Sequence, residues 1–177
     1  GQMQIRFGQL QPNSTYELWA YAANSIGEVC TDTISLSTSS TFVLSEPGQL
    51  AKLMQGEVCE ASELAFQGPL NSDDLRCLRA MMGRDEQGNE TGGLLARADL
   101  TEVTIVEGGS AYDETHFAQY DVIGAGMFAR LDRLERIQLP ATATRIEENA
   151  FEGCTGLKSL LIPASVKRIG QSRGCTA

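Results

Sequence analysis

The sequence lacks the long apolar run that a membrane-spanning helix requires. No stretch approaches the roughly 20 consecutive apolar residues that cross a bilayer as a helix. No signal peptide is visible at the N-terminus either. Because the chain opens with Gly1 rather than Met, we expect a processed or engineered start, upstream of which an export signal can have been removed.

The sequence is also short of the motifs on which catalysis depends. Its single histidine, His116, would have to serve any Ser or Cys triad, and Gly-x-Ser-x-Gly does not occur. Glycine pairs at 92–93 and 108–109 lack the patterns that cradle phosphate, so we interpret them as turns. No particular pair of carboxylates is indicated for glycoside hydrolysis. We therefore predict that the chain is not an enzyme and has neither catalytic residues nor a cofactor.

Metal-ligand patterns are equally sparse. Asp113, Glu114 and His116 are close in sequence, but HExxH and a second histidine are absent, so we expect a solvated loop rather than a metal site. The cysteines form no CxxC pair and no metal spacing. Their odd number leaves at least one thiol unpaired in a monomer, and the sequence leaves the disulfide state open. The five cysteines are Cys30, Cys59, Cys77, Cys154 and Cys175.

Charge is abundant but unevenly distributed. The formal net charge is -9, with 17 acidic and 6 basic residues in 1–120 against 6 acidic and 8 basic residues in 121–177. A nucleic-acid partner is excluded, since it would need clustered Lys and Arg in a strongly basic domain. The acidic half is most simply interpreted as a solubilising surface.

What the sequence does contain is a repeat of 23 residues between Asp121 and Ala177. A period of this length with a Leu-x-x-Ile-x-Leu-Pro core predicts a solenoid, whose short units bury their apolar edge by stacking. Ile137 and Leu139 alternate with Gln138 as in a half-buried strand, and Pro140 ends it. The equivalent positions are Ile123, Ile146 and Ile169; Phe128 and Phe151; Leu134 and Leu157; Ile137 and Leu160; Leu139 and Ile162; Pro140 and Pro163.

The segment from Arg145 to Gly170 resembles the BspA-like leucine-rich repeats of bacterial surface proteins. Those repeats have the form Ile-Gly-x-x-Ala-Phe-x-Gly-Cys-x-x-Leu, followed by an Ile-x-Ile-Pro strand. The resemblance departs at Gly174, which stands where Phe151 would recur, so either the array stops there or the chain was cut. The matching residues are Phe151, Gly153, Cys154, Leu157 and Pro163.

Residues 1–42 are predicted to form a three-stranded antiparallel β meander, with strands at 4–7, 16–22 and 29–38. They resemble the last strands of a fibronectin type III module, in which Tyr16 would make the tyrosine corner. Such sandwiches need about 100 residues, so the apolar face of this partial module is expected to pack on the next domain or on a second copy. The resemblance rests on Leu10, Pro12, Tyr16, Ala22, Asn24 and Gly27.

Residues 43–177 are assigned to a leucine-rich repeat domain, with an N-terminal cap at 49–99 and repeats at 100–177. The cap is predicted to hold one helix with Leu50, Leu53 and Met54 on its apolar side, and a second helix from Asn71 to about Met82. In the second helix we expect Asp74 to cap the start and Leu75, Leu78 and Met82 to form an inward-facing stripe.

Arg76 and Arg79 are expected to lie off that inward-facing stripe, in solvent or paired with carboxylates. The loop 83–93 is expected to be mobile. The fold class is therefore α+β, a short solenoid with an α/β cap.

Leu100, Val103 and Ile105 repeat the spacing of the later strands, so residues 100–133 are interpreted as an earlier unit with an 11-residue insertion. In the insertion, at 107–120, three aromatic residues are candidate anchors, although Phe117 is equally well suited to the core. Outward-facing strand residues are expected to stack in adjacent columns, where solenoids bind partners. The predicted ligand surface comprises Glu102, Thr104, Arg136, Gln138, Ser159, Leu161 and Tyr112; the other two aromatics are Phe117 and Tyr120.

Together, the solenoid and the resemblance predict a non-catalytic binding protein. The resemblance implies a bacterial surface or secreted protein with an adhesion role. The expected ligand is a protein, a glycan or another macromolecule, and a host extracellular molecule is one candidate. The alternative is an accessory binding or spacer module of a larger glycan-degrading enzyme. Self-association is expected through the exposed β segment.

Overall fold

The computed structural model describes most of the chain, and the body of the fold lies between residues 41 and 170. The described residues are 15–19, 21–24, 27–30, 33–37, 41–54 and 59–170. In chain order the elements of the body are β5 (Thr41–Val43), α1 (Gln49–Met54), β6 (Glu63–Leu70), α2 (Ser72–Met81), β7 (Arg97–Ile105), β8 (Val122–Ile123), β9 (Arg136–Gln138), β10 (Arg145–Ile146), β11 (Ser159–Leu161) and β12 (Arg168–Ile169).

The N-terminal strands form two antiparallel pairs, β1 with β4 and β2 with β3. Asn24 lies opposite Gly27 in the β2–β3 pair. The three-stranded meander is not confirmed, because its expected first strand at 4–7 lies outside the described residues. The strands are β1 (Thr15–Leu18), β2 (Tyr21–Asn24), β3 (Gly27–Cys30) and β4 (Ile34–Ser37).

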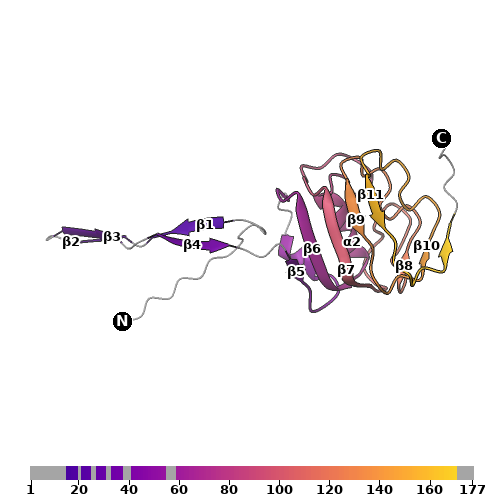
Figure 1. The fold of residues 1–177 in the computed structure, drawn as a ribbon, viewed down its shortest axis with the longest axis horizontal. Coiled ribbons are helices and arrows are strands. Elements are labelled where there is room, and N and C mark those ends of the chain that lie inside the picture. The colour runs from indigo at the N-terminus through magenta and orange to yellow at the C-terminus, as the bar shows by residue number, and fades with distance from the viewer. Residues whose placement is uncertain are drawn as a thin grey trace.

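A five-stranded parallel sheet forms one side of the body, in the order β11-β9-β7-β6-β5 (Figure 1). Its strands alternate between buried and exposed residues. In β6, for example, Leu64 and Phe66 are buried while Glu63 and Gln67 are exposed. β5 is an edge strand of this sheet and spans the expected domain boundary at residues 42–43, so the placing of that boundary stays a prediction.

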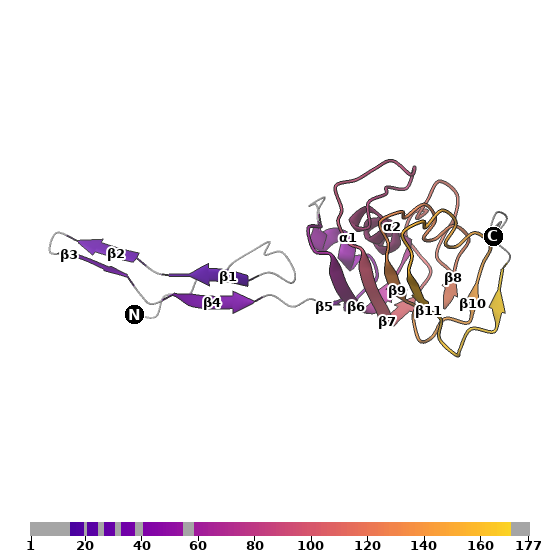
Figure 2. The same cartoon turned by 45° about the horizontal axis from the view of Figure 1, so that its top comes forward.

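The repeat produces a second parallel sheet, in the order β12-β10-β8 (Figure 2). Ile123, Ile146 and Ile169 lie in register across it, so the 23-residue spacing does correspond to stacked coils. Ile123 and Ile146 are buried, but Ile169 is 59% exposed. The spine of stacked isoleucines therefore exists, and its last side chain lies at an open edge of the described coil.

The turns between strands repeat with the same period. Phe128 and Phe151 stack with ring centroids 5.4 Å apart, and the Cys154 thiol donates to the Phe128 carbonyl at 2.9 Å. Gly126 and Asn149 share a left-handed backbone conformation, with φ of 64° and 58°. Each coil thus turns at the same place, which is what lets successive coils stack.

The cap contains both predicted helices. Asn71 is the N-cap of α2, and Asp74 completes a capping box as expected. Leu75 is buried, and the expected inner stripe of α2 is confirmed at Leu78 and Met82 as well. In α1, however, Leu53 is 51% exposed, so the expected inner stripe holds only at Leu50 and Met54. Neither helix, in the part of the chain described, has the length and apolarity to span a bilayer.

The loop at 83–93 is a tight, internally bonded turn, and its expected mobility stays a prediction. Its ends meet in a bridge between Arg84 and Glu90. The Asp85 carboxylate accepts the backbone N–H groups of Gln87 and Asn89 at 3.0 and 2.8 Å. These bonds stabilise the turn internally. Arg84 Nη2 links it to the repeats by donating to Asp132 Oδ1 at 3.1 Å.

Candidate functional site

The outer face of the five-stranded sheet is the first candidate site. Both helices contribute buried side chains to the core, together with the inward residues of the strands. The alternate residues of the same strands are exposed or half-buried. Parallel sheets are normally covered on both faces, so an exposed outer face sets this sheet apart.

The predicted surface residues occupy this face, except for Tyr112. Arg136 lies opposite Ser159, and Gln138 lies opposite Leu161. Gln138 is half-buried, whereas Leu161 is 58% exposed. Glu102 and Thr104 are also exposed, on β7.

The predicted stacking of outward-facing residues is wrong on β7, where the residues beside β9 lie five positions earlier in the sequence than expected. Glu102 and Thr104 were expected beside Arg136 and Gln138, but β9 pairs with the first residues of β7 instead. Leu95, Ala98 and Leu100 are buried and correspond to Leu134, Ile137 and Leu139 of the repeat. The repeat pattern therefore occurs twice in this part of the chain, once around Ala98 and once around Val103. The copy around Ala98 is the one that aligns with β9. The observed rows are Arg97, Arg136 and Ser159, followed by Asp99, Gln138 and Leu161.

Charges along one edge of this face are paired across strands. Arg97 contacts Glu63 at 3.0 Å and Glu135 at 3.3 Å, and Lys158 contacts Glu135 at 2.7 Å. Lys158 and, more weakly, Arg97 hold the pKa of Glu135 below its ordinary value. Exposed pairs of this kind contribute little to stability. Arg136 is not among these pairs, which leaves its charge available on the face.

Tyr112 is the exception, because the structure places it in the core and not on the ligand surface. It is fully buried, and its hydroxyl donates to the Ala125 carbonyl at 2.8 Å. Burial, reinforced by the charges of Asp113 and Glu147, raises the pKa of Tyr112, so it stays protonated. Phe117 and Tyr120, by contrast, are 57% and 62% exposed. The aromatics that the insertion presents to solvent are thus these two.

The loop that carries the single histidine is closed on itself. The Asp113 carboxylate accepts backbone N–H groups from Thr115 and His116 at 2.9 and 2.7 Å and contacts His116 Nδ1 at 2.8 Å. The imidazole also stacks on Tyr112, with centroids 6.2 Å apart. Among the described residues, no three ligating side chains gather as a metal site would require.

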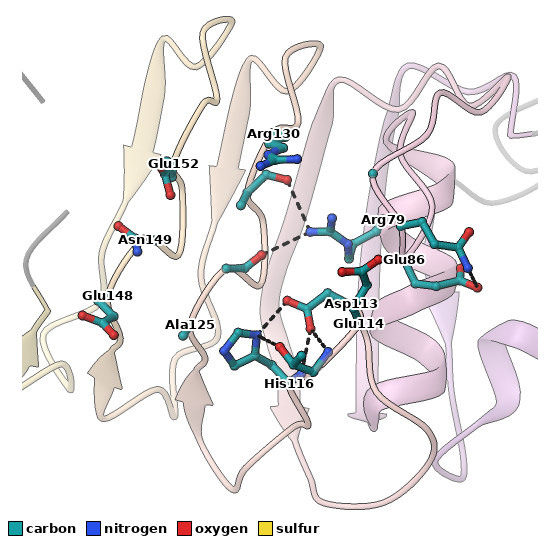
Figure 3. Close-up of a pocket in the computed structure, with 15 residues that line it drawn as sticks. Arg79, Glu86, Asp113, Glu114, His116, Ala125, Arg130, Glu148, Asn149 and Glu152 are labelled. Carbon is teal, nitrogen blue, oxygen red and sulfur yellow. Dashed lines mark hydrogen bonds and ion pairs between the residues drawn. The ribbon is translucent and has the colours of Figure 1, made fainter. Parts of the chain in front are cut away.

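This loop forms one wall of a cleft of about 410 Å³, which is the second candidate site (Figure 3). The turn at 86–88 of the cap, the loop 113–116 and the repeat turns at 125–130 and 148–152 surround it. The cleft lies at the turns of the coils, whereas the sheet face lies along the strands.

Arg79 lies at this cleft, and its predicted place off the buried stripe of α2, in solvent or paired with a carboxylate, is wrong. It is 4% exposed, and its Nη1 donates to the carbonyls of Met127 at 2.9 Å and Gly126 at 3.2 Å. Desolvation lowers the pKa of Arg79, and the nearby Asp113 opposes this shift. The signal was present, because Arg79 follows Leu75 by four residues and therefore shares its buried helix face.

Comparison with known proteins agrees with the repeat. Residues 112–173 match a family described as BspA type Leucine rich repeat region (6 copies). No curated protein matches the chain. The resemblance of residues 1–42 to fibronectin type III finds no support. Leucine-rich repeats are a class of protein-interaction modules, generally without catalytic activity. The match confirms the BspA-like leucine-rich-repeat resemblance of this segment, which makes up about a third of the chain.

Proposed function

We propose that this protein is a non-catalytic binding protein that holds a macromolecular partner, preferably a protein, on the outer face of its five-stranded sheet. The observation that carries the proposal is the exposed face of a parallel sheet, a surface that other proteins usually cover with helices. The match to leucine-rich repeats supports it, since solenoids use such extended faces for binding.

Arg136 and Leu161 are the residues on which we expect binding to depend. Arg136 is exposed and is not engaged in the charge pairs of its row, and Leu161 offers a large apolar side chain in the next row. Arginine is enriched among the residues that dominate binding energy. An exposed apolar side chain such as that of Leu161 adds a favourable contribution when a partner removes it from water. Gln138, which lies opposite Leu161 and on the same strand as Arg136, offers hydrogen bonds to a partner's backbone.

The proposed location is the cell surface or the extracellular space, with adhesion as the role. The motivation is the BspA-type match, because repeats of this type are typical of surface or secreted bacterial proteins. Detection of the protein on intact cells by surface proteolysis or antibody labelling would test this. Recovery only from the cell interior would contradict it.

The binding proposal is tested by screening the chain against immobilised matrix proteins and a glycan array. The double variant Arg136→Ala with Gln138→Ala should weaken any detected interaction about tenfold or more, since loss of a central arginine costs over 1 kcal/mol. Lys167→Ala removes an equally exposed cation next to β12 and serves as the control, with an expected change below twofold. Equal affinities of the double variant and the unaltered chain would place the site elsewhere.

A further inference from the structure

The strand β11 is an edge of the five-stranded sheet, and no strand from the described part of the chain lies along its outer side (Figure 1). An edge strand presents backbone N–H and C=O groups that can pair with another polypeptide. The contacts between neighbouring strands recur along this sheet, so they indicate what a polypeptide would need in order to fit beside β11. This edge is a different surface from the outer face of the sheet.

Backbone hydrogen bonds provide the first of these recurring contacts. Just before β6, β7 and β9, one carbonyl accepts two N–H groups from the start of the next strand of the sheet, at distances of 2.8 to 3.2 Å. These carbonyls belong to Ser62, Ala96 and Glu135. The equivalent carbonyl before β11 is that of Lys158, which accepts no hydrogen bond from the described residues. It is therefore available to the N–H groups of an added strand.

Ion pairs between strands provide the second recurring contact. Arg97 contacts Glu63 at 3.0 Å and Glu135 at 3.3 Å, and Glu135 in turn contacts Lys158 at 2.7 Å. Negative and positive side chains thus alternate from β6 to β11. The Lys158 side chain is 74% exposed and, among the described residues, has a carboxylate on one side only. Opposite charges on neighbouring strands attract, so an acidic residue is favoured on the other side of Lys158.

Apolar side chains provide the third recurring contact. Ile137 lies between β7 and β11 and is fully buried, and Leu139 is 2% exposed. The equivalent residues one coil later are less covered, since Leu160 is half-buried and Ile162 is 42% exposed. A strand with apolar side chains beside these two residues would remove them from water. The segment that fits has an acidic residue, followed by apolar residues two and four positions later.

We propose that the edge of β11 binds an extended segment of a partner protein, which adds a sixth parallel strand to the sheet. The partner's carboxylate pairs with Lys158, its N–H groups donate to the Lys158 carbonyl, and its apolar side chains pack beside Leu160 and Ile162. In binding of this kind, main-chain hydrogen bonds provide affinity and the side chains provide specificity. The pattern Leu-Glu-x-Ile-x-Leu meets these requirements, and the chain itself places it beside β7, at residues 134–139.

Titration of the isotope-labelled chain with the peptide acetyl-Leu-Glu-Arg-Ile-Gln-Leu-amide, followed by NMR, tests this proposal. We expect saturable shifts of backbone amides centred on 157–163. A nitroxide at the N-terminus of the peptide should broaden the amide of Lys158 more than that of Leu161, because parallel strands begin at the same end. The opposite order would mean an antiparallel strand and would overturn the proposal.

Reversal of the charge at Lys158 tests the specificity of the edge. Lys158→Glu should weaken binding of this peptide about tenfold. The same peptide with lysine in place of its glutamate should bind that variant about as tightly as the original peptide binds the unaltered chain, which a merely structural role of Lys158 would not produce. Lys52→Glu is the matched control, since it makes the same change in charge at an exposed position on α1, and its binding should stay within twofold. Equal weakening by both variants would indicate a general charge effect and overturn the proposal.

The double variant Arg136→Ala with Gln138→Ala separates this site from the sheet face. It should bind the peptide within twofold of the unaltered chain, so the two proposals can fail independently. A tenfold loss would place the peptide on the face and overturn the edge proposal. Absence of saturable shifts up to about 5 mM peptide would also overturn it. Dimerisation of the chain that Lys158→Glu abolishes would assign the edge to a second copy, which would equally overturn binding of a partner segment.

Discussion

Asp74 is fully buried, although carboxylates rarely are without partners. Its two oxygens accept the backbone N–H groups of Gly48 at 2.6 Å, Leu50 at 2.9 Å and Asn71 at 3.1 Å. One side chain therefore caps α2 and also anchors the start of α1. We predict that Asp74→Ala lowers the free energy of unfolding by about 3 kcal/mol or more, because two buried donors and one partly buried donor lose a charged acceptor.

Urea unfolding followed by circular dichroism measures this effect, and the neighbouring residue supplies the control. Asp73 is partly exposed, pairs with Arg76 at 3.0 Å and accepts from Ser110. Asp73→Ala should cost no more than about 1 kcal/mol, since solvent replaces much of what is lost. Similar losses in the two variants would mean that Asp74 does not connect the two helices as described.

Asp113 gives the protein an acid-sensitive contact. Partial burial alone raises the pKa of Asp113, but hydrogen bonds from Thr115 and His116 outweigh it, so the pKa is lowered. A lowered pKa in the folded state stabilises the protein above the ordinary value of about 4, and this stabilisation disappears as pH falls through the lowered pKa. We predict that Asp113→Asn is less stable than the unaltered chain at pH 7 and that the difference shrinks below about pH 4.

Unfolding midpoints in urea at several pH values between neutral and about pH 3 would show this convergence. Glu60→Asn is a suitable control, since Glu60 is exposed and lies outside the loop. It should follow the unaltered chain at every pH. A constant difference between Asp113→Asn and the unaltered chain down to the lowest pH would contradict the assignment of the contact.

At the scale of the element, α2 shows how far the sequence alone could lead. Its bounds, its cap and the buried Leu75, Leu78 and Met82 followed from helical periodicity. The prediction that Arg79 is exposed was wrong, because it gave the charge of the side chain more weight than its position on the helix. A charged side chain on a buried stripe has to find acceptors, and the turn carbonyls that bind Arg79 lie about 50 residues along the chain. Periodicity indicates which face is buried, but not what it meets.

The strand β7 shows a different limit. Two Leu-x-x-x-x-Leu-type patterns overlap in it, one centred on Ala98 and one on Val103, and both sets of residues are buried. A strand of nine residues has room for both, since it pairs along its whole length with β6 but only at its start with β9. The hydrophobic pattern of β7 indicates which of its residues face inward. It does not indicate which part of the strand pairs with β9, since both halves of β7 carry the same pattern.

The insertion is attached to the repeats through Tyr112. Its hydroxyl bonds the Ala125 carbonyl, and Gly124 leaves the room that this contact needs, since a Cβ there would lie 2.5 Å from the hydroxyl. We predict that Tyr112→Phe costs about 1 kcal/mol, because a carbonyl beside the core loses its donor. Tyr120→Phe is the matched control: Tyr120 is 62% exposed, and its variant should unfold as the unaltered chain does.

Thermal or urea unfolding of both variants checks the prediction. If Tyr112→Phe is as stable as the unaltered chain, the hydroxyl contact does not hold the insertion. Tyr112→Ala extends the series and should cost about 3 kcal/mol or more, since a large core side chain is removed.

For the whole molecule, burial decreases along the coil axis. Ile123 is fully buried, Ile146 is 5% exposed and Ile169 is 59% exposed, although the three lie in register at one position of the repeat. In a solenoid each coil is covered by its neighbours, so identical residues contribute according to their place in the stack. This explains how a repeat that keeps isoleucine at one position in three coils produces an uneven core.

Replacing each of the three isoleucines by alanine tests whether their contributions to stability follow their burial. Ile123→Ala should lower the free energy of unfolding by about 3 kcal/mol, as expected for a buried isoleucine, and Ile146→Ala by a similar amount. Ile169→Ala should cost less than about 1 kcal/mol, since its side chain already contacts water. Because the substitution is the same at three equivalent positions, unfolded-state effects largely cancel. Equal losses at all three sites would mean that the coil of Ile169 is covered as fully as the coil of Ile123, and the decrease in burial would be wrong.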